Sequence, residues 1–154
     1  MAYHYEESGL ENVYLENGYT IHQTTYGEGV SIQDTEGLHK AIGRCIVSEP
    51  NRISGAELRF LRLEMELTQR ALAGLLGSAE QNVRNWEKVR KRPIPGAADR
   101  LLRALYTEYV DGRSDVRRMV DRLAELDCVE VENMRFRETD RGWQKKKTEE
   151  RNVT

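Results

Sequence analysis

The sequence predicts a mainly α-helical fold, a five-helix bundle with a small N-terminal antiparallel β-hairpin or sheet and a short C-terminal extension. Three observations predict it. Apolar residues recur at helical spacing through most of residues 54–123. Capping residues stand where those helices should begin, and glycine stands where several should end. Residues that favour β-strands gather before residue 33, around Asn-Gly and Gly-Glu-Gly turns.

The N-terminal residues 10–32 are expected to form the sheet. Asn17-Gly18 separates Val13–Leu15 from the β-rich run Tyr19–Tyr26, and Asn-Gly favours the type I′ turn of a hairpin. Gly27-Glu28-Gly29 then turns the chain toward a further strand at Val30–Ile32. Asp34 or Thr35 could cap a helix that runs to about Val47, with an apolar stripe of Leu38, Ala41, Ile42, Cys45 and Ile46.

The central helices begin after a Glu-Pro-Asn link at residues 49–51. Ser54–Glu57 has the spacing of a capping box, and Leu58, Leu61 and Met65 follow on one face. Thr68 caps a short second helix that Gly77 ends, with a core face of Ala71, Leu72, Leu75 and Leu76. Ser78–Gln81 is a second candidate capping box, opening a third helix at 79–89 with Val83 and Trp86 inward. Pro95 starts a fourth, with Ala98, Leu101, Leu102, Leu105 and Tyr109 inward.

The C-terminal third is less regular. Ser114 can cap a fifth helix whose stripe of Val116, Met119, Val120 and Leu123 is either core or a dimer seam. Val129–Glu132 and Met134–Phe136 alternate like strands, and the charged residues 138–154 are expected to be mobile or ordered only by a partner. We therefore divide the chain into an N-terminal β-hairpin plus helix (1–50), a helical domain (51–110) and a C-terminal helix with a charged tail (111–154).

Composition excludes several classes of protein. The chain has 154 residues, 38% hydrophobic and 32% charged, and no apolar run approaches the ~18 residues of a membrane-spanning helix. The first residues do not resemble a signal peptide, so we expect a cytoplasmic protein. Cys45 and Cys128 form no CxxC pair, which argues against a zinc site, and both are expected to be buried. His4, His22 and His39 are scattered, His39 being a surface or capping residue. We expect no catalytic residues, no metal and no cofactor, and hence no enzyme.

Charge is unevenly distributed along the chain. Residues 1–53 carry three basic and eight acidic side chains, a net charge of −5, whereas residues 54–103 carry ten basic and six acidic ones, a net charge of +4. Residues 104–154 are nearly neutral, with eleven basic and twelve acidic side chains. A basic middle between acidic flanks indicates a local electrostatic footprint there, the alternative being basic side chains that only solvate a helix face.

The second and third helices have the pattern of a helix-turn-helix motif. Two short helices are joined by a few residues containing Gly77, and Val83 and Trp86 anchor the second helix. Its outward residues are left free for a DNA major groove, where Gln and Asn pair with adenine and Arg with guanine. These residues are Glu80, Gln81, Asn82, Arg84 and Asn85. The alternative is a solvated polar face on a helical bundle.

These residues resemble a known family. Leu67–Ala73, Leu76-Gly77, Gln81–Lys88 and Arg92-Pro93 resemble the Xre/Cro/CI helix-turn-helix (the lambda-repressor-like fold) of phage repressors and antitoxins. Ser8–Leu15, Gly37–Ile42, Gly55–Arg62 and Ala98–Arg103 look like the MqsA-type (YgiT-like) antitoxin family. Members of that family usually begin with a zinc ribbon of two CxxC pairs that holds the toxin, and this sequence lacks it. The resemblance therefore implies DNA binding and dimerisation.

The resemblance also implies roles for single residues. Gln69 would bond a phosphate, and Gln81, Asn82 and Asn85 would face bases. Arg90, Lys91 and Arg92 would meet the DNA backbone, the alternative being an exposed loop. Arg62 and Glu87 would form a largely buried ion pair, since each lies at the border of an apolar face where a charge persists only when paired. The alternative is a local pair between Arg62 and Glu66.

Together these patterns predict a sequence-specific transcriptional regulator, a repressor of its own operon. It would act at the nucleoid as a homodimer on an inverted-repeat operator in double-stranded DNA, read by the helix at 79–89. The alternative function is that of a protein-interaction module that neutralises a cognate toxin as a type II antitoxin.

Overall fold

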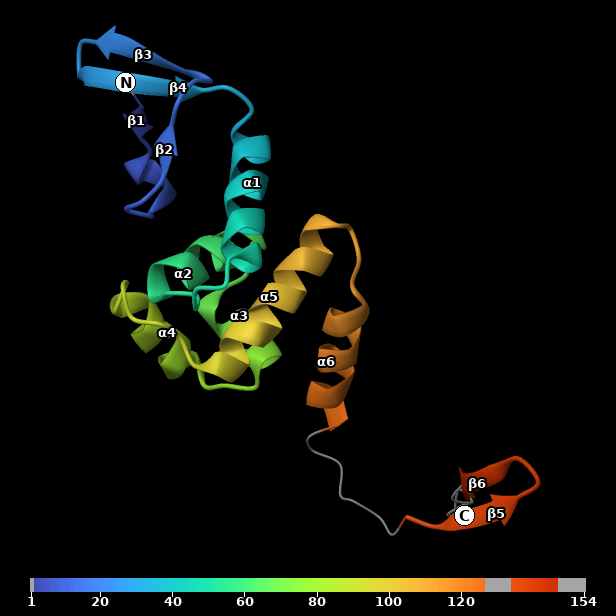
Figure 1. The fold of residues 1–154 in the computed structure, drawn as a ribbon. Coiled ribbons are helices and arrows are strands. Elements are labelled where there is room, and N and C mark those ends of the chain that lie inside the picture. Colours follow the sequence, from blue (N-terminus) through green and yellow to red (C-terminus); the bar gives the residue numbers. More distant parts are fainter. Residues whose placement is uncertain (1, 127–133, 147–154) are drawn as a thin grey trace, which may run out of the picture.

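The computed structural model describes residues 2–126 and 134–146. Within these ranges the chain forms six α-helices and three two-stranded antiparallel sheets (Figure 1). The prediction of a five-helix bundle with one N-terminal hairpin is therefore wrong. The helix at 35–48 joins the core instead of lying outside the bundle, and the β-strands separate into three pairs. The helices are α1 (Thr35–Ser48), α2 (Gly55–Glu64), α3 (Gln69–Leu76), α4 (Glu80–Lys88), α5 (Gly96–Val110) and α6 (Asp115–Leu126).

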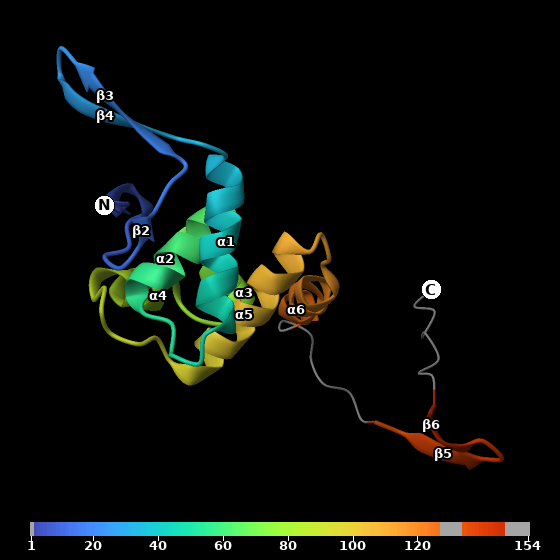
Figure 2. The ribbon, with the colours of Figure 1, turned by 45° about the horizontal axis from the view of Figure 1, so that its top comes forward.

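The N-terminal region contains two sheets where one was expected. β1 (Tyr3–His4) pairs with β2 (Tyr14–Leu15), and β3 (Tyr19–Thr24) pairs with β4 (Gly27–Ile32). Gly18 has the positive φ of 78° that a turn needs, but the strands on either side of it do not pair. β3 instead finds a longer match downstream, with six residue pairs that set Tyr19 opposite Ile32. Both views show β3 and β4 projecting away from the helices (Figures 1 and 2).

Most helix starts follow the predicted caps. The Asp34 side chain accepts from the Gly37 N–H, the Ser54–Glu57 capping box is complete, and Thr68 accepts from the Ala71 N–H. The second capping box is wrong. α4 has Ala79 as its N-cap residue with no side-chain cap, because the helix begins one residue later than that box requires, and the Ser78 hydroxyl accepts from the Asn82 side chain.

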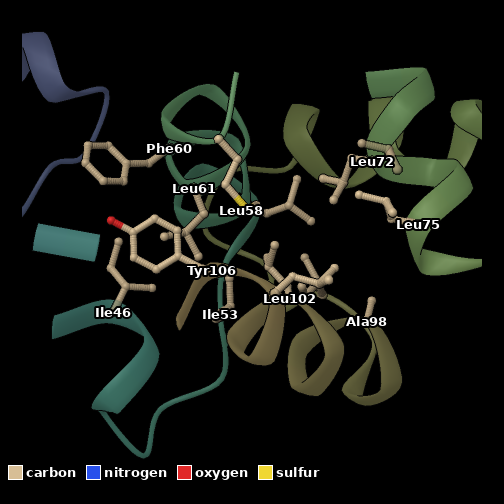
Figure 3. Packing of buried hydrophobic residues seen from close by; sticks show 14 of the residues in the cluster. Ile46, Ile53, Leu58, Phe60, Leu61, Leu72, Leu75, Ala98, Leu102 and Tyr106 are labelled. Carbon is tan, nitrogen blue, oxygen red and sulfur yellow. The ribbon is translucent and has the colours of Figure 1, made fainter. Parts of the chain in front are cut away.

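The core lies between α1, α2, α3 and α5 (Figure 3). Val83 of α4 also belongs to it. Tyr106 is 1% exposed and takes the inward place expected of Tyr109, which is 46% exposed. Ala73 is buried on α3, where Ala71 was expected, and Ala71 faces solvent. Cys45 is exposed instead of buried, and Cys128 lies outside the described residues.

The close packing of α1 on α5 depends on a glycine. A Cβ added to Gly43 would lie 1.9 Å from the Tyr106 hydroxyl, far inside contact distance. α1 therefore approaches this near only because residue 43 has no side chain.

The C-terminal helix is only partly packed. Val116 and Val120 contact the core, whereas Met119 and Leu123 of the same stripe are 56% and 55% exposed. Beyond it, β5 (Phe136–Thr139) begins at the last residue of the strand expected at Met134–Phe136, and it pairs with β6 (Gly142–Lys145), which lies in the charged segment expected to be mobile or ordered only by a partner. The strand expected at Val129–Glu132 lies outside the described residues. No helix in residues 2–126 is long and apolar enough to cross a membrane.

Candidate nucleic-acid interface

α3 and α4 are joined by the three residues Gly77–Ala79 and pack against each other. Gly77 ends α3 in the left-handed conformation, at φ 66°, which allows the sharp turn. Val83 and Glu87 are buried on the inner face of α4, while its outer face is polar and largely solvent-exposed. The chain thus has two short helices that are joined by a tight turn and packed together, with the second helix at the surface.

The outer face of α4 carries a row of paired polar side chains, which we call the polar row: Glu80, Gln81, Asn82, Arg84 and Asn85. The Gln81 amide donates to Asn85 Oδ1 over 2.9 Å, and the Asn82 amide donates to the Ser78 hydroxyl over 3.0 Å. Arg84 pairs with Glu80 at 2.7 Å. All these hydrogen bonds join exposed side chains four residues apart, and such bonds contribute little free energy. A DNA base edge could therefore replace one partner of each hydrogen bond with little loss of stability.

The inner end of α4 is fixed by a buried ion pair. Arg62 donates from Nε to Glu87 Oε2 over 3.0 Å and from Nη2 to Oε1 over 2.8 Å. The two side chains are only 10% and 5% exposed. Arg62 also donates to the Leu67 carbonyl oxygen over 2.9 Å. The pair therefore joins α2 and the start of the motif to the end of the helix that carries the polar row.

Gln69, predicted to bond a phosphate, lies beside this pair. Its amide nitrogen donates to Glu87 Oε2 over 3.3 Å and is partly buried. The amide group has a second N–H, so a phosphate contact would leave the bond to Glu87 in place. Gln69 thus lies between the buried carboxylate and the surface at the start of α3.

Within the described residues, two of the three cations after α4 contact the N-terminal segment and one does not. Arg90 donates to the Gly9 carbonyl oxygen, and Lys91 Nζ lies 3.5 Å from Glu11 Oε2. Arg92 makes no side-chain hydrogen bond or ion pair with any residue in the described ranges. The N-terminal segment therefore occupies two of the predicted backbone contacts and leaves one available.

A concave surface of about 510 Å³ lies along the side of α4. It is lined by Arg52, Asn82, Asn85, Trp86, Val89, Arg92, Pro93 and Pro95. Sequence reasoning missed Arg52, a lone cation in the link between α1 and α2. Only the tertiary pairing of this link with the residues after α4 brings Arg52 beside the polar row, and no local pattern signals it.

An ion pair on α5, between Asp99 and Arg103, was also missed, and it holds that link. Asp99 accepts from the Ile53 N–H over 2.6 Å and from Arg103 Nε over 2.7 Å. Burial raises the pKa of the Asp99 carboxyl, but the hydrogen bonds from Arg103 and Ile53 outweigh burial, and the net pKa is lowered. Arg103 also donates to the carbonyl oxygens of Val47, Glu49 and Asn51.

His39 is half-buried in a chain of hydrogen bonds and is neither a surface nor a capping residue. Its Nε2 lies 2.7 Å from the Tyr5 hydroxyl, and its Nδ1 lies 2.6 Å from Glu64 Oε1. Burial raises the pKa of Tyr5. The three residues belong to the N-terminal segment, α1 and α2, so they attach the N-terminal segment to the helices.

In residues 2–126 and 134–146, no group of three or more His, Cys, Asp or Glu side chains could hold a metal ion. Comparison of the chain with family models, with curated proteins and with solved structures finds no match.

Proposed function

We propose that this protein is a sequence-specific DNA-binding regulator that places α4 in the major groove. The observation that carries the proposal is the exposed polar row on the second helix of a helix-turn-helix, fixed from behind by the buried pair of Arg62 and Glu87. Such a helix fits the width of the groove, and its amides and guanidinium match the edges of adenine and guanine.

The contacts divide into two kinds. Gln81, Asn82 and Asn85 face the bases, with Glu80 and Arg84 beside them, and they carry the sequence preference. Gln69 and the cations after α4 meet phosphates, which sets position and affinity without reading sequence. Arg90 and Lys91 would first have to leave Gly9 and Glu11, whereas Arg92 needs no such exchange.

One helix-turn-helix covers too few base pairs to select a genomic site, so we propose a homodimer on an inverted repeat. Two-fold symmetry would place the two α4 helices about 34 Å apart, one turn of DNA. Sedimentation of the purified protein with and without DNA tests this. A monomer at micromolar concentration that protects a single half-site would contradict it.

The test of base reading uses Asn85→Ala. On a DNA site selected from a random library, the variant should lose about 1–3 kcal/mol of binding free energy, and on unrelated DNA little. Gln33→Ala is the matched control, because Gln33 is also an exposed amide but lies before α1. Equal losses on both DNAs would show that Asn85 does not read sequence.

Binding of a toxin-like protein is a second candidate function. A groove of about 790 Å³ runs between the N-terminal segment and α1, with Val13, Leu38 and Ile42 among its lining residues, and Ile21 and Tyr26 of the neighbouring hairpin are exposed. The test is titration calorimetry with the product of the adjacent reading frame. Binding that Ile42→Asp abolishes, while α4 still binds DNA, would support this function.

A further inference from the structure

Two arginines that are 40 positions apart line the same concave surface beside α4. The Ile94 N–H donates to the Ile53 carbonyl oxygen over 2.9 Å, and the Gly55 N–H donates to the Arg92 carbonyl oxygen over 3.1 Å. Ser54 and Pro93 face each other between these bonds as an antiparallel bridge. Arg52 and Arg92 lie at the two ends of this bridge, and both line the concave surface that Asn82 and Asn85 also line.

The backbone that carries Arg52 is held on both sides. The Asn51 carbonyl oxygen accepts from Arg103, and the Ile53 N–H donates to Asp99 over 2.6 Å. At the other arginine, a Cβ added to Gly55 would lie 1.9 Å from the Trp86 carbonyl oxygen, so the bridge packs directly on α4. The backbone that carries the two cations therefore keeps a fixed position relative to the polar row, so only side-chain freedom is lost when they bind a ligand.

Most of the hydrogen-bonding capacity of this pair is unused. Arg52 donates from one Nη2 to the Ile94 carbonyl oxygen, and a guanidinium has five N–H donors. Arg92 makes no side-chain hydrogen bond or ion pair within the described residues. Arg84, by contrast, is paired with Glu80, and Lys91 with Glu11. Arg52 and Arg92 thus both keep N–H donors free for an anion at the concave surface.

We propose that Arg52 and Arg92 together clamp one phosphodiester of the DNA strand that borders the groove occupied by α4. This inference rests on the proposed function. The planar guanidinium forms two parallel hydrogen bonds to phosphate oxygens, so two arginines can hold both free oxygens of one phosphodiester. A phosphate held there fixes the register of α4, because the clamp adjoins the base-facing Asn82 and Asn85.

The test measures binding constants against salt for the full chain and for Arg52→Gln, Arg92→Gln and the double variant. Each single change should lower the log–log salt slope by about 0.9 and the double change by about 1.8, alike on the selected site and on unrelated DNA. Arg113→Gln is the matched control. Arg113 is exposed and paired with Asp115 beyond the end of α5, so its loss should leave the slope unchanged.

Arg52→Lys separates charge from geometry. The variant keeps the positive charge and should keep the salt slope. It loses the planar guanidinium that forms two parallel hydrogen bonds, so it should bind DNA several-fold more weakly. Thermal melting shows which variants are folded. A folded Arg52→Gln or Arg92→Gln with the parent slope would overturn the clamp. The proposed function would remain supported even without the clamp if the parent prefers its selected site and Asn85→Ala removes that preference. A parent protein without any site preference would overturn both.

Discussion

The helical module at residues 53–106 and the hairpin of β3 and β4 are stabilised in different ways. In the module, side chains from distant positions meet in a closed interior, and Ile53, Leu58, Leu61 and Leu102 are at most 1% exposed. In the hairpin, six backbone-paired positions form a ladder, yet Ile21 is 48% exposed and Tyr26 fully exposed. The module is held by burial and the hairpin by its turn and backbone bonds.

This difference bears on function. A polar row that reads DNA needs a rigid support, and the module provides one through the buried pair behind α4. The hairpin offers exposed apolar side chains on a support that the core does not hold, which suits contact with another protein better than base reading. Substitutions should therefore have large effects in the module and small ones in the hairpin.

The largest effect is expected from Glu87→Ala. Removing the carboxylate leaves the Arg62 guanidinium buried and unpaired, so the free energy of unfolding should fall by about 3–5 kcal/mol. Urea denaturation measures it. The double change Arg62→Met with Glu87→Met should recover much of the loss. A Glu87→Ala protein that melts within about a degree of the parent would mean that the pair does not support α4.

The next largest loss in the free energy of unfolding is expected from Gly43→Ala. The new Cβ would collide with the Tyr106 ring inside the core, and overpacking of this kind costs about 1–3 kcal/mol. Gly74→Ala in α3 is the control, because a Cβ there meets nothing within 4 Å. By helix propensity alone it should stabilise the protein by up to about 1 kcal/mol. Equal effects at both positions would show that α1 does not pack closely on α5.

Asp99 gives the module a dependence on pH. Because its pKa is lower in the folded protein than in the unfolded chain, where it is about 3.9, the carboxylate stabilises the fold above that value. That contribution is lost as the pH falls through the folded pKa. Asp99→Asn should cost about 1–3 kcal/mol at pH 7 and progressively less below about pH 4. Denaturation at several pH values measures this, and a constant difference between parent and variant would contradict it.

The smallest effect is expected in the hairpin. Ile21→Ala should change the free energy of unfolding by less than about 0.5 kcal/mol, as substitutions at exposed sites usually do. The same change at Ile53, which is 1% exposed, should cost about 2–5 kcal/mol. Similar losses at the two isoleucines would show that the hairpin is part of the cooperative core.

Sequence patterns predicted the parts of the fold that short-range chemistry decides. Ser54, Thr68 and Gly77 act within one turn of helix, and the structure has them as predicted. Asn17-Gly18 and Ser78 have equally good local signals, but other partners prevailed. β3 pairs with β4 and not across the Asn17-Gly18 turn, and the Ser78 hydroxyl accepts from the Asn82 amide and does not cap α4. The residues next to a turn or a cap do not show which of two possible partners forms the hydrogen bonds.

The candidate site divides in the same way. The polar row could be predicted because helical periodicity alone determines which face of α4 is polar. The position of Arg52 could not, because it follows from a bridge between residues about 40 positions apart. Likewise, the three adjacent cations Arg90, Lys91 and Arg92 look alike in sequence, and only the docked N-terminal segment distinguishes them.

A footprint of the purified protein on the DNA upstream of its own gene tests the central claim most directly. We expect two protected half-sites, arranged as an inverted repeat with centres about 10 base pairs apart, or a multiple of that spacing. Asn85→Ala should lose this protection at concentrations where Gln33→Ala keeps it. If the protein protects no site at micromolar concentration, or if Asn85→Ala protects the same bases as the parent, α4 does not read this DNA.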